Sequence, residues 1–281
     1  MPAPALNDHH GLVRPWERGR SFLLESTPPT PALARVIDRH WVVRWDRRGR
    51  DPFRQEILPH PSVNLVVEPG GARIWGVPTH RDVRLLRGVG WAAGVKFRPG
   101  AFTAVTGVDA AALTNGSMPV ADALGAELEA ALRSASPDDL AAVATSVEAR
   151  LAPLAGITDP ALDLVVAVFD SVRAIAPHAR VEQIASMHHV SPRTLHRVFR
   201  RYVGVPPKWV LKRLRIHEAV EQLLVASPRS WTELALDLGY YDHAHFIRDF
   251  RFVVGCSPAE FASSSPTRSS GTASPRAAPA R

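Results

Sequence analysis

Two patterns of apolar residues divide the chain. Between Trp41 and Arg98 the apolar residues form short runs rich in Val, Ile, Trp and Phe, such as VNLVVE at 63–68, and Gly and Pro separate these runs. Such short runs between turn residues are typical of strands joined by hairpins. After Pro99 the apolar residues recur at helical spacing. The sequence therefore predicts an α+β protein in which a β-rich domain precedes a helical one.

Helix-start signals divide the chain further. Thr30-Pro31 predicts the start of a short helix through Arg39, because Thr is a good N-cap and Pro suits the first helical position. Three more helices are predicted over Asp122–Arg133, Pro137–Leu151 and Pro160–Ile175. The expected parts are a β-rich domain (1–115), a helical coupler (116–176), an all-α domain (177–262) and a disordered Ser/Pro/Ala-rich tail (263–281).

A repeat of about 50 residues lies in the C-terminal half. VEQIASMHHVSPRTLHRVFRRYVGVPP at 181–207 aligns with WTELALDLGYYDHAHFIRDFRFVVGCSP at 231–258. Ala185 matches Ala235 at an offset of 50, whereas Arg197 matches Arg248 at an offset of 51, so the second turn holds one extra residue. Repetition at this period indicates one supersecondary unit used twice.

Each copy has the pattern helix, tight turn, helix. Ser191-Pro192 caps the second helix of the first copy, and Asp242 caps that of the second copy. Sequences of the S-x-x-E capping-box type at Ser230 and Ser257 support the register. This is the layout of a helix-turn-helix, whose second helix enters the DNA major groove. The alternative is a pair of ordinary α-hairpins with surface arginines.

Residues 206–226, between the copies, predict one connecting helix, because Val and Leu recur there at helical spacing. Its length would be about 31 Å at ~1.5 Å per residue. Successive major grooves on one face of B-DNA lie roughly 34–36 Å apart. A stiff helix of that length could therefore set two recognition helices one DNA turn apart.

The charge distribution favours a polyanionic partner for this half. The formal net charge of +7 is weak evidence by itself. The segment from Arg193 to Arg215 is more specific, because it holds eight basic residues and no acidic one, whereas residues 116–157 carry a net charge of −4. The alternative is a basic helix that only faces solvent.

Some classes of protein and site are disfavoured. Cys256 is the only cysteine, which excludes an intrachain disulfide and a Cys-based zinc cluster. A packing role is favoured for it over the alternative of a nucleophile, because no catalytic partner is evident in the sequence. The N-terminus lacks the pattern of a signal peptide, and no run approaches the ~18 apolar residues of a membrane span. We therefore expect a cytoplasmic protein with no membrane partner.

The C-terminal motifs resemble the DNA-binding domain of the AraC/XylS family of bacterial transcription regulators. The resemblance covers roughly 175–262. It rests on S-x-R-x-L-x-R-x-F (191–199), G-x-x-P (204–207), E-L-A-x-x-L-G-Y (233–240), H-F-x-R-x-F (245–250) and G-x-S-P-x-E-F (255–261). It implies double-stranded DNA and RNA polymerase as partners. Whether the output is activation or repression is left open.

The resemblance also implies roles for individual residues. The base-reading positions fall on Arg193, His196 and Arg197 in the first copy, and on His243, Ala244, His245 and Arg248 in the second. Arginine can donate two hydrogen bonds to guanine, whereas an alanine methyl can only contact the methyl group of thymine. Phosphate contacts, each with a solvated surface residue as the alternative, are expected at Ser191, Thr194, Arg200, Arg201, Lys212, Arg215 and Arg251.

The N-terminal part resembles, more loosely, a domain of unassigned ligand attached to such regulators. A small-molecule effector and a second copy of the chain are its expected partners. Candidate pocket residues, each with a core or surface role as the alternative, are Trp45, Arg54, His60, Asn64, Trp75, Lys96 and Arg98. An enzyme with a cupin-like metal site at His60 and His80, or an architectural DNA-binding protein, are the other hypotheses. We expect no catalysis, cofactor or metal, because no motif for them is evident.

Overall fold

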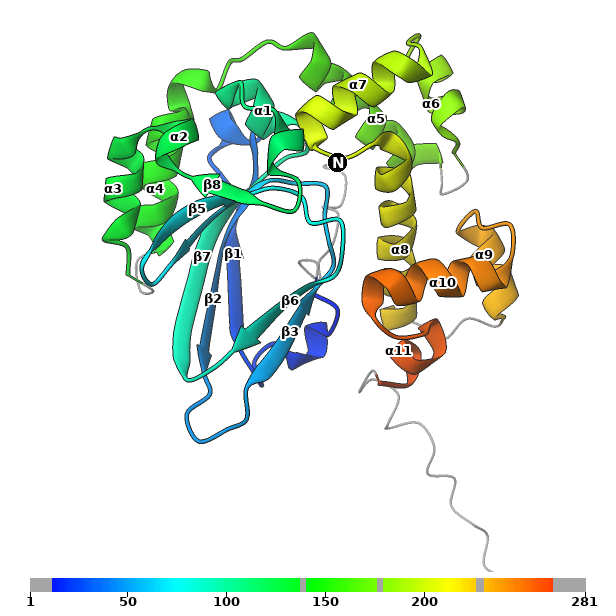
Figure 1. Cartoon of the computed structure of the whole chain (residues 1–281), viewed down its shortest axis with the longest axis horizontal. Helices are drawn as coiled ribbons and strands as arrows, with labels where there is room; N and C mark the ends of the chain where they lie inside the picture. Colours follow the sequence, from blue (N-terminus) through cyan, green and yellow to red (C-terminus); the bar gives the residue numbers. More distant parts are fainter. Residues whose placement is uncertain (1–11, 137–139, 176–178, 226–229, 265–281) are drawn as a thin grey trace, which may run out of the picture.

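A β-rich domain and a helical domain lie side by side in the computed structural model (Figure 1). The structure describes residues 12–136, 140–175, 179–225 and 230–264. The presence of a β-rich domain followed by a helical one confirms the α+β prediction. No helix in these ranges is long and apolar enough to cross a membrane.

The first domain is built on a six-stranded antiparallel sheet with the order β1-β2-β7-β4-β5-β8, and β3 and β6 form a separate two-stranded ribbon. Alternation along the strands decides which side is buried; in β4, Leu65 and Val67 are buried and their neighbours less so. The strands are β1 (Leu23–Thr27), β2 (Ile37–Asp46), β3 (Phe53–Ile57), β4 (Asn64–Glu68), β5 (Gly71–Trp75), β6 (Asp82–Leu86), β7 (Val89–Phe97) and β8 (Ser117–Pro119).

Short helices cover one face of the large sheet (Figure 1). Leucines and valines from these helices share one core with strand residues such as Val95 and Phe97. The elements are α1 (Ala101–Thr106), α2 (Ala121–Leu124), α3 (Ala126–Arg133) and α4 (Leu140–Leu151), with 3₁₀ turns η1 (Pro15–Glu17), η2 (Pro31–Leu33), η3 (Ala110–Leu113) and η4 (Ala152–Leu154).

The structure corrects three expectations in this part. The helix expected from Thr30 to Arg39 is wrong, because only the turn η2 forms and β2 begins at Ile37, which is fully buried in the sheet core. Gly125, at a φ of 97°, divides the helix expected over 122–133 into α2 and α3. The coupler expected over 116–176 is not a separate layer, since β8 pairs with β5 and α2–α4 belong to the sheet core.

The second domain is helical, and its repeat is present as predicted. Each helix-turn-helix is a pair of helices, α6–α7 and α9–α10, and α8 joins the two units. The start predicted at Pro137 lies outside the described residues, as does the tail beyond 264. The helices are α5 (Pro160–Ile175), α6 (Val181–Met187), α7 (Pro192–Val203), α8 (Pro207–Val225), α9 (Trp231–Asp237), α10 (His243–Val254) and α11 (Pro258–Ser264).

Helix α8 contributes to two separate cores. Its first turns place Val210 and Leu211 in the core of the first unit, together with α5, α6 and α7. Further along, Ile216, Val220 and Leu223 pack in the core of the second unit with α9, α10 and α11. Because each end of α8 is buried in a different unit, this helix fixes the separation between the two units.

Candidate nucleic-acid interface

The first helix-turn-helix has a closed turn and a capped second helix. The amide of Val190 donates to the carbonyl of Ala185 at 3.0 Å, which closes the turn. The Ser191 hydroxyl accepts from the Thr194 amide at 3.0 Å and caps α7, as predicted from the sequence. At the other end Gly204, at a φ of 88°, ends the helix. Helix α7 is therefore a rigid element with a defined start and end.

The two faces of α7 differ sharply. Leu195, Phe199 and Val203 are buried in the core of the first unit. All three predicted base-reading side chains of this helix are exposed, and so are two predicted phosphate contacts: Arg193, His196, Arg197, Arg200 and Arg201. None of the four arginines forms a salt bridge with a described residue. The helix thus presents a positive surface to solvent.

The second helix-turn-helix repeats this construction with different surface chemistry. The Tyr240 amide donates to the Ala235 carbonyl at 2.9 Å, and the Asp242 carboxylate accepts from the His245 amide at 2.7 Å. Of the four predicted base-reading side chains, Ala244 and Arg248 are exposed, and His243 and His245 are half-buried. The two units therefore share their backbone geometry but not their charge.

An acidic residue links α10 to α8. The Asp249 carboxylate lies 3.0 Å from Lys212 Nζ and 3.5 Å from His245 Nε2. The His245 ring also lies 5.2 Å, edge to face, from the Tyr240 ring. His245, a predicted base-reading residue, and Lys212, a predicted phosphate contact, thus share the carboxylate of Asp249. This pairing was not predicted from the sequence.

The turns differ at one backbone position. His189 has a φ of 54° in the first turn, and Gly239 has a φ of 74° in the second. Both values lie in the left-handed region, which glycine adopts freely and other residues adopt at a cost. Both turns therefore need the same backbone conformation, and only the second uses the residue that suits it.

Two arginines of α8 make tertiary hydrogen bonds. Arg215 donates through its two terminal nitrogens to the carbonyls of Gly239 and Ala179, each at 3.3 Å, which ties the two units together. Arg213 is buried at 3% exposure and donates to the carbonyl of Thr79 in the N-terminal domain at 3.1 Å. Burial lowers its pKa to about 10. The basic run of the sequence thus includes side chains that face inward.

The N-terminal domain contacts α7, α8 and α11 of the helical domain. The Thr114 hydroxyl donates to the carbonyl of Gly204 at 2.7 Å, at the end of α7. The His217 ring of α8 lies 3.0 Å from the carbonyl of Pro59. Burial lowers the pKa of this imidazole to about 4, so the neutral ring donates this hydrogen bond. Near α11, the rings of Trp16 and Phe261 lie 5.8 Å apart.

The seven predicted pocket residues do not gather at one place. Trp75, Asn64 and Lys96 face one another across β5, β4 and β7 and share one side of the sheet. His60 contacts the His217 ring at 5.5 Å instead, and Arg98 donates to the carbonyl of Ala34. Trp45 borders a groove of about 440 Å³ that contains none of the other six.

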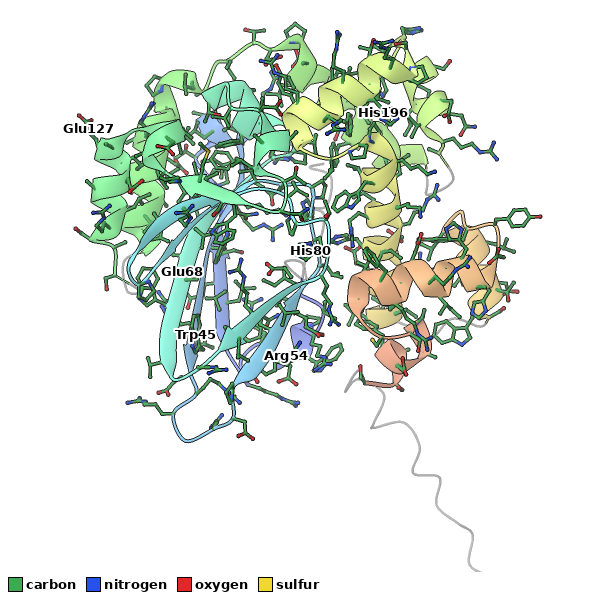
Figure 2. The ribbon with its side chains drawn as sticks, viewed as in Figure 1. Trp45, Arg54, Glu68, His80, Glu127 and His196 are labelled. Carbon is green, nitrogen blue, oxygen red and sulfur yellow. The ribbon has the colours of Figure 1, made fainter. Side chains whose placement is uncertain are left out.

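The labelled side chains show this dispersal directly. Figure 2 places Trp45 and Arg54 in the lower part of the β-rich domain, His80 at its border with α8, and His196 on α7. Arg54 and His80 are exposed. Among the described residues there is no group of three or more His, Cys, Asp or Glu side chains placed to hold a metal ion.

Lys96 takes part in a partly buried cluster of charges. Its Nζ lies 3.4 Å from the Asp38 carboxylate, which also accepts from Arg39 at 3.0 Å. Burial raises the pKa of Asp38, but the attraction of Lys96 and Arg39 outweighs it and leaves this pKa below its usual value. Lys96 therefore forms a salt bridge with Asp38 and does not line an open pocket.

Comparison with known proteins divides the chain in the same way. Residues 184–264 match a helix-turn-helix domain family, and residues 25–119 match a domain of unknown function, DUF6597. The transcriptional activator RhaS of Escherichia fergusonii is 40% identical over 79 residues, which is 28% of each chain. An uncharacterised transcriptional regulator of Haemophilus influenzae is 31% identical over 81 residues, 29% of this chain and 27% of that protein.

Among solved structures, an AraC-type regulator of Chromobacterium violaceum is 25% identical, covering 36% of this chain and 90% of that one, with a TM-score of 0.34. ToxT of Vibrio cholerae is 11% identical, covering 86% and 98%, with a TM-score of 0.41. The chain spans less than a third of the length of the curated relatives it matches. From its motifs, its two capped turns and these sequence matches, residues 184–264 form a helix-turn-helix domain of the AraC/XylS type.

Proposed function

We propose that this protein is a sequence-specific DNA-binding transcription regulator whose helices α7 and α10 enter successive major grooves of one duplex. The observation that carries the proposal is the pair of capped helix-turn-helix units, of which the first exposes four arginines that form no salt bridge with a described residue. The relatives that match residues in this domain include a transcriptional activator, which supports the same function.

The length of α8 is compatible with binding of the two units to successive grooves of one duplex. Helix α7 lies at the upper end of α8, and α10 crosses α8 nearer its other end (Figure 1). Helix α8 has 19 residues, or about 28 Å at ~1.5 Å per residue. Adjacent major grooves on one face lie roughly 34–36 Å apart, and the width of the two units adds to the length of α8. We therefore expect two half-sites about one helical turn apart.

The exposed residues take distinct roles in this proposal. The first helix reads through Arg193, His196 and Arg197, of which the two arginines donate to guanine edges. The second helix reads through His243, Ala244, His245 and Arg248. Ser191, Thr194, Arg200, Arg201, Lys212 and Arg251 contact phosphates, which fixes position without selecting sequence. We leave Arg215 out of this set, because its terminal nitrogens already donate to two backbone carbonyls.

The N-terminal domain is proposed to modulate binding through a small-molecule effector or a dimer contact. Its direct hydrogen bonds to α7 and α8 support this role, since a change in the domain would reach both elements. RNA polymerase is the further partner expected of a regulator.

The test is selection of binding sites from random DNA with the full chain, followed by titration of the selected duplex. Arg197→Ala should weaken binding by about 1–3 kcal/mol and relax preference at one base position. Arg200→Ala is the matched control on the same helix, and its loss should be equal for every sequence. A selection that returns no motif would favour an architectural DNA-binding protein, and unchanged affinity of Arg197→Ala would refute its assigned role.

A further inference from the structure

The extra residue of the second turn is Tyr241. The hydrogen bonds that close the two turns pair Val190 with Tyr240, at an offset of 50. The N-caps of the following helices pair Ser191 with Asp242, at an offset of 51. The chain therefore adds one residue between the closing hydrogen bond and the cap, and that residue has no counterpart in the first unit.

The side chain of Tyr241 projects into solvent. It is 93% exposed, whereas the preceding Tyr240 is 3% exposed and packs its ring against Phe246 at 5.4 Å. The turn thus places two adjacent tyrosines in opposite environments. A single exposed aromatic residue is ordinary on a protein surface, so exposure alone assigns no role.

The position of Tyr241 in the chain is the second argument for a role in binding DNA. Tyr241 directly precedes the cap of α10, and the first residues of a recognition helix are those that meet base edges. The residues next to them lie near the phosphates that border the groove. In the aligned copies Ala244 stands where the first unit has Arg193, so the first turn of α10 contains no arginine or lysine. Tyr241 supplies a long polar side chain where the second unit lacks that cation.

We propose that the Tyr241 hydroxyl donates a hydrogen bond to a DNA phosphate at the edge of the second half-site and thereby positions α10 in its groove. This inference rests on the proposed function. It makes Tyr241 a positioning residue, since a phosphate carries no sequence information. The second unit would then compensate for its missing arginine with a neutral contact.

The first test compares the full-length protein with Tyr241→Phe, which keeps the ring and removes only the hydroxyl. Affinity for the selected duplex should fall by roughly ten- to a hundredfold, because hydrogen bonds to charged groups contribute more than neutral ones. The loss should be the same for every base substitution in the second half-site. The slope of log affinity against log salt should not change, because a neutral donor displaces no counterion.

Two controls separate this role from a general effect. Phe252→Ala removes another exposed aromatic side chain, 67% exposed, near the opposite end of α10, and should leave affinity unchanged. Arg200→Ala should reduce the salt slope by about one, as expected of a cationic phosphate contact. Thermal unfolding of Tyr241→Phe should match the wild-type protein, since the Tyr241 side chain is 93% exposed.

A second measurement locates the phosphate. Duplexes that carry one neutral methylphosphonate at each position around the second half-site are titrated with both proteins. At one position the methylphosphonate should lower the affinity of the wild-type protein for the duplex and leave the affinity of Tyr241→Phe unchanged. Equal affinity of the two proteins for all duplexes, or a loss confined to one base pair, would overturn the inference while leaving the proposed function intact. Absence of specific binding by the wild-type protein would instead refute the proposed function.

Discussion

The two helix-turn-helix units have nearly the same backbone and very different surfaces. Each has a turn closed by a hydrogen bond to an alanine, a side-chain cap, and a glycine at positive φ that ends the second helix. Yet α7 exposes four arginines, whereas α10 exposes two, Arg248 and Arg251, and holds His245 beside Asp249. The fold is set by the buried and capping positions, so the exposed positions are free to diverge. We expect the first unit to contribute more to sequence recognition.

The units also differ in how the N-terminal domain contacts them. The glycines that end α7 and α10 are equivalent in the repeat, and both lie against that domain: Gly204 faces Ala110 and Thr114, and Gly255 faces Arg81. At the first unit the Thr103 and Thr114 hydroxyls donate to the backbone carbonyls of Arg201 and Gly204. At the second, apolar Val13 and Leu58 join the core. The N-terminal domain thus contacts the ends of both α7 and α10 at the same structural position.

The largest expected effects come from the matched aromatic residues of the two cores. Phe199 is 1% exposed and Phe250 is 0% exposed, and each lies in a different core. Phe199→Ala and Phe250→Ala should each lower the free energy of unfolding by about 3–5 kcal/mol, through lost burial and the cavity left behind. Denaturant unfolding measures this. The exposed Phe252 is the control, and a loss as large for Phe252→Ala would contradict the assignment of the cores.

A smaller effect is expected at the contact between α7 and the N-terminal domain. A Cβ at Gly204 would lie 2.9 Å from the carbonyl oxygen of Ala110, and the residue has a φ of 88°. Gly107 ends α1 at a φ of 75° with open space around it. Gly107→Ala should therefore cost only the backbone strain, about 1–2 kcal/mol, and Gly204→Ala should cost more because a clash is added. Equal losses in thermal or denaturant unfolding would show that the contact with Ala110 relaxes freely.

Local signals account for what could be predicted from the sequence. The caps at Ser191, Asp242 and Ser257 lie within three residues of the amides they accept from, so a short motif is enough to find them. The repeat predicted the two turns for the same reason, since each turn lies within one short copy of the repeat. Helical spacing was also sufficient for α8, whose predicted range agrees closely with its observed one.

Pairing between distant segments accounts for what could not be predicted. Strand β8 pairs with β5, although more than 40 residues separate the two strands in the sequence. This pairing places part of the expected coupler in the sheet. Arg213 and His217 looked like ordinary positions of a connecting helix, but their partners are backbone carbonyls in the N-terminal domain. The seven candidate pocket residues do not gather at one place for the same reason, because residue type alone cannot show which side chains a sheet brings to one face.

The smallest effect is expected from His189→Gly, the substitution that gives the first turn the glycine found in the second. His189 adopts a φ of 54° in the first turn, where the second turn has Gly239. His189→Gly should remove about 1–2 kcal/mol of left-handed strain, against which the greater freedom of glycine in the unfolded chain costs about 0.5–1 kcal/mol. The net gain in unfolding free energy should be about 0.5–1 kcal/mol, measured by denaturant unfolding. Gly239→Ala is the reciprocal variant and should lose about 1–2 kcal/mol because it introduces the strain. If His189→Gly proved destabilising instead, the exposed imidazole would have to contribute an interaction worth more than the strain it imposes.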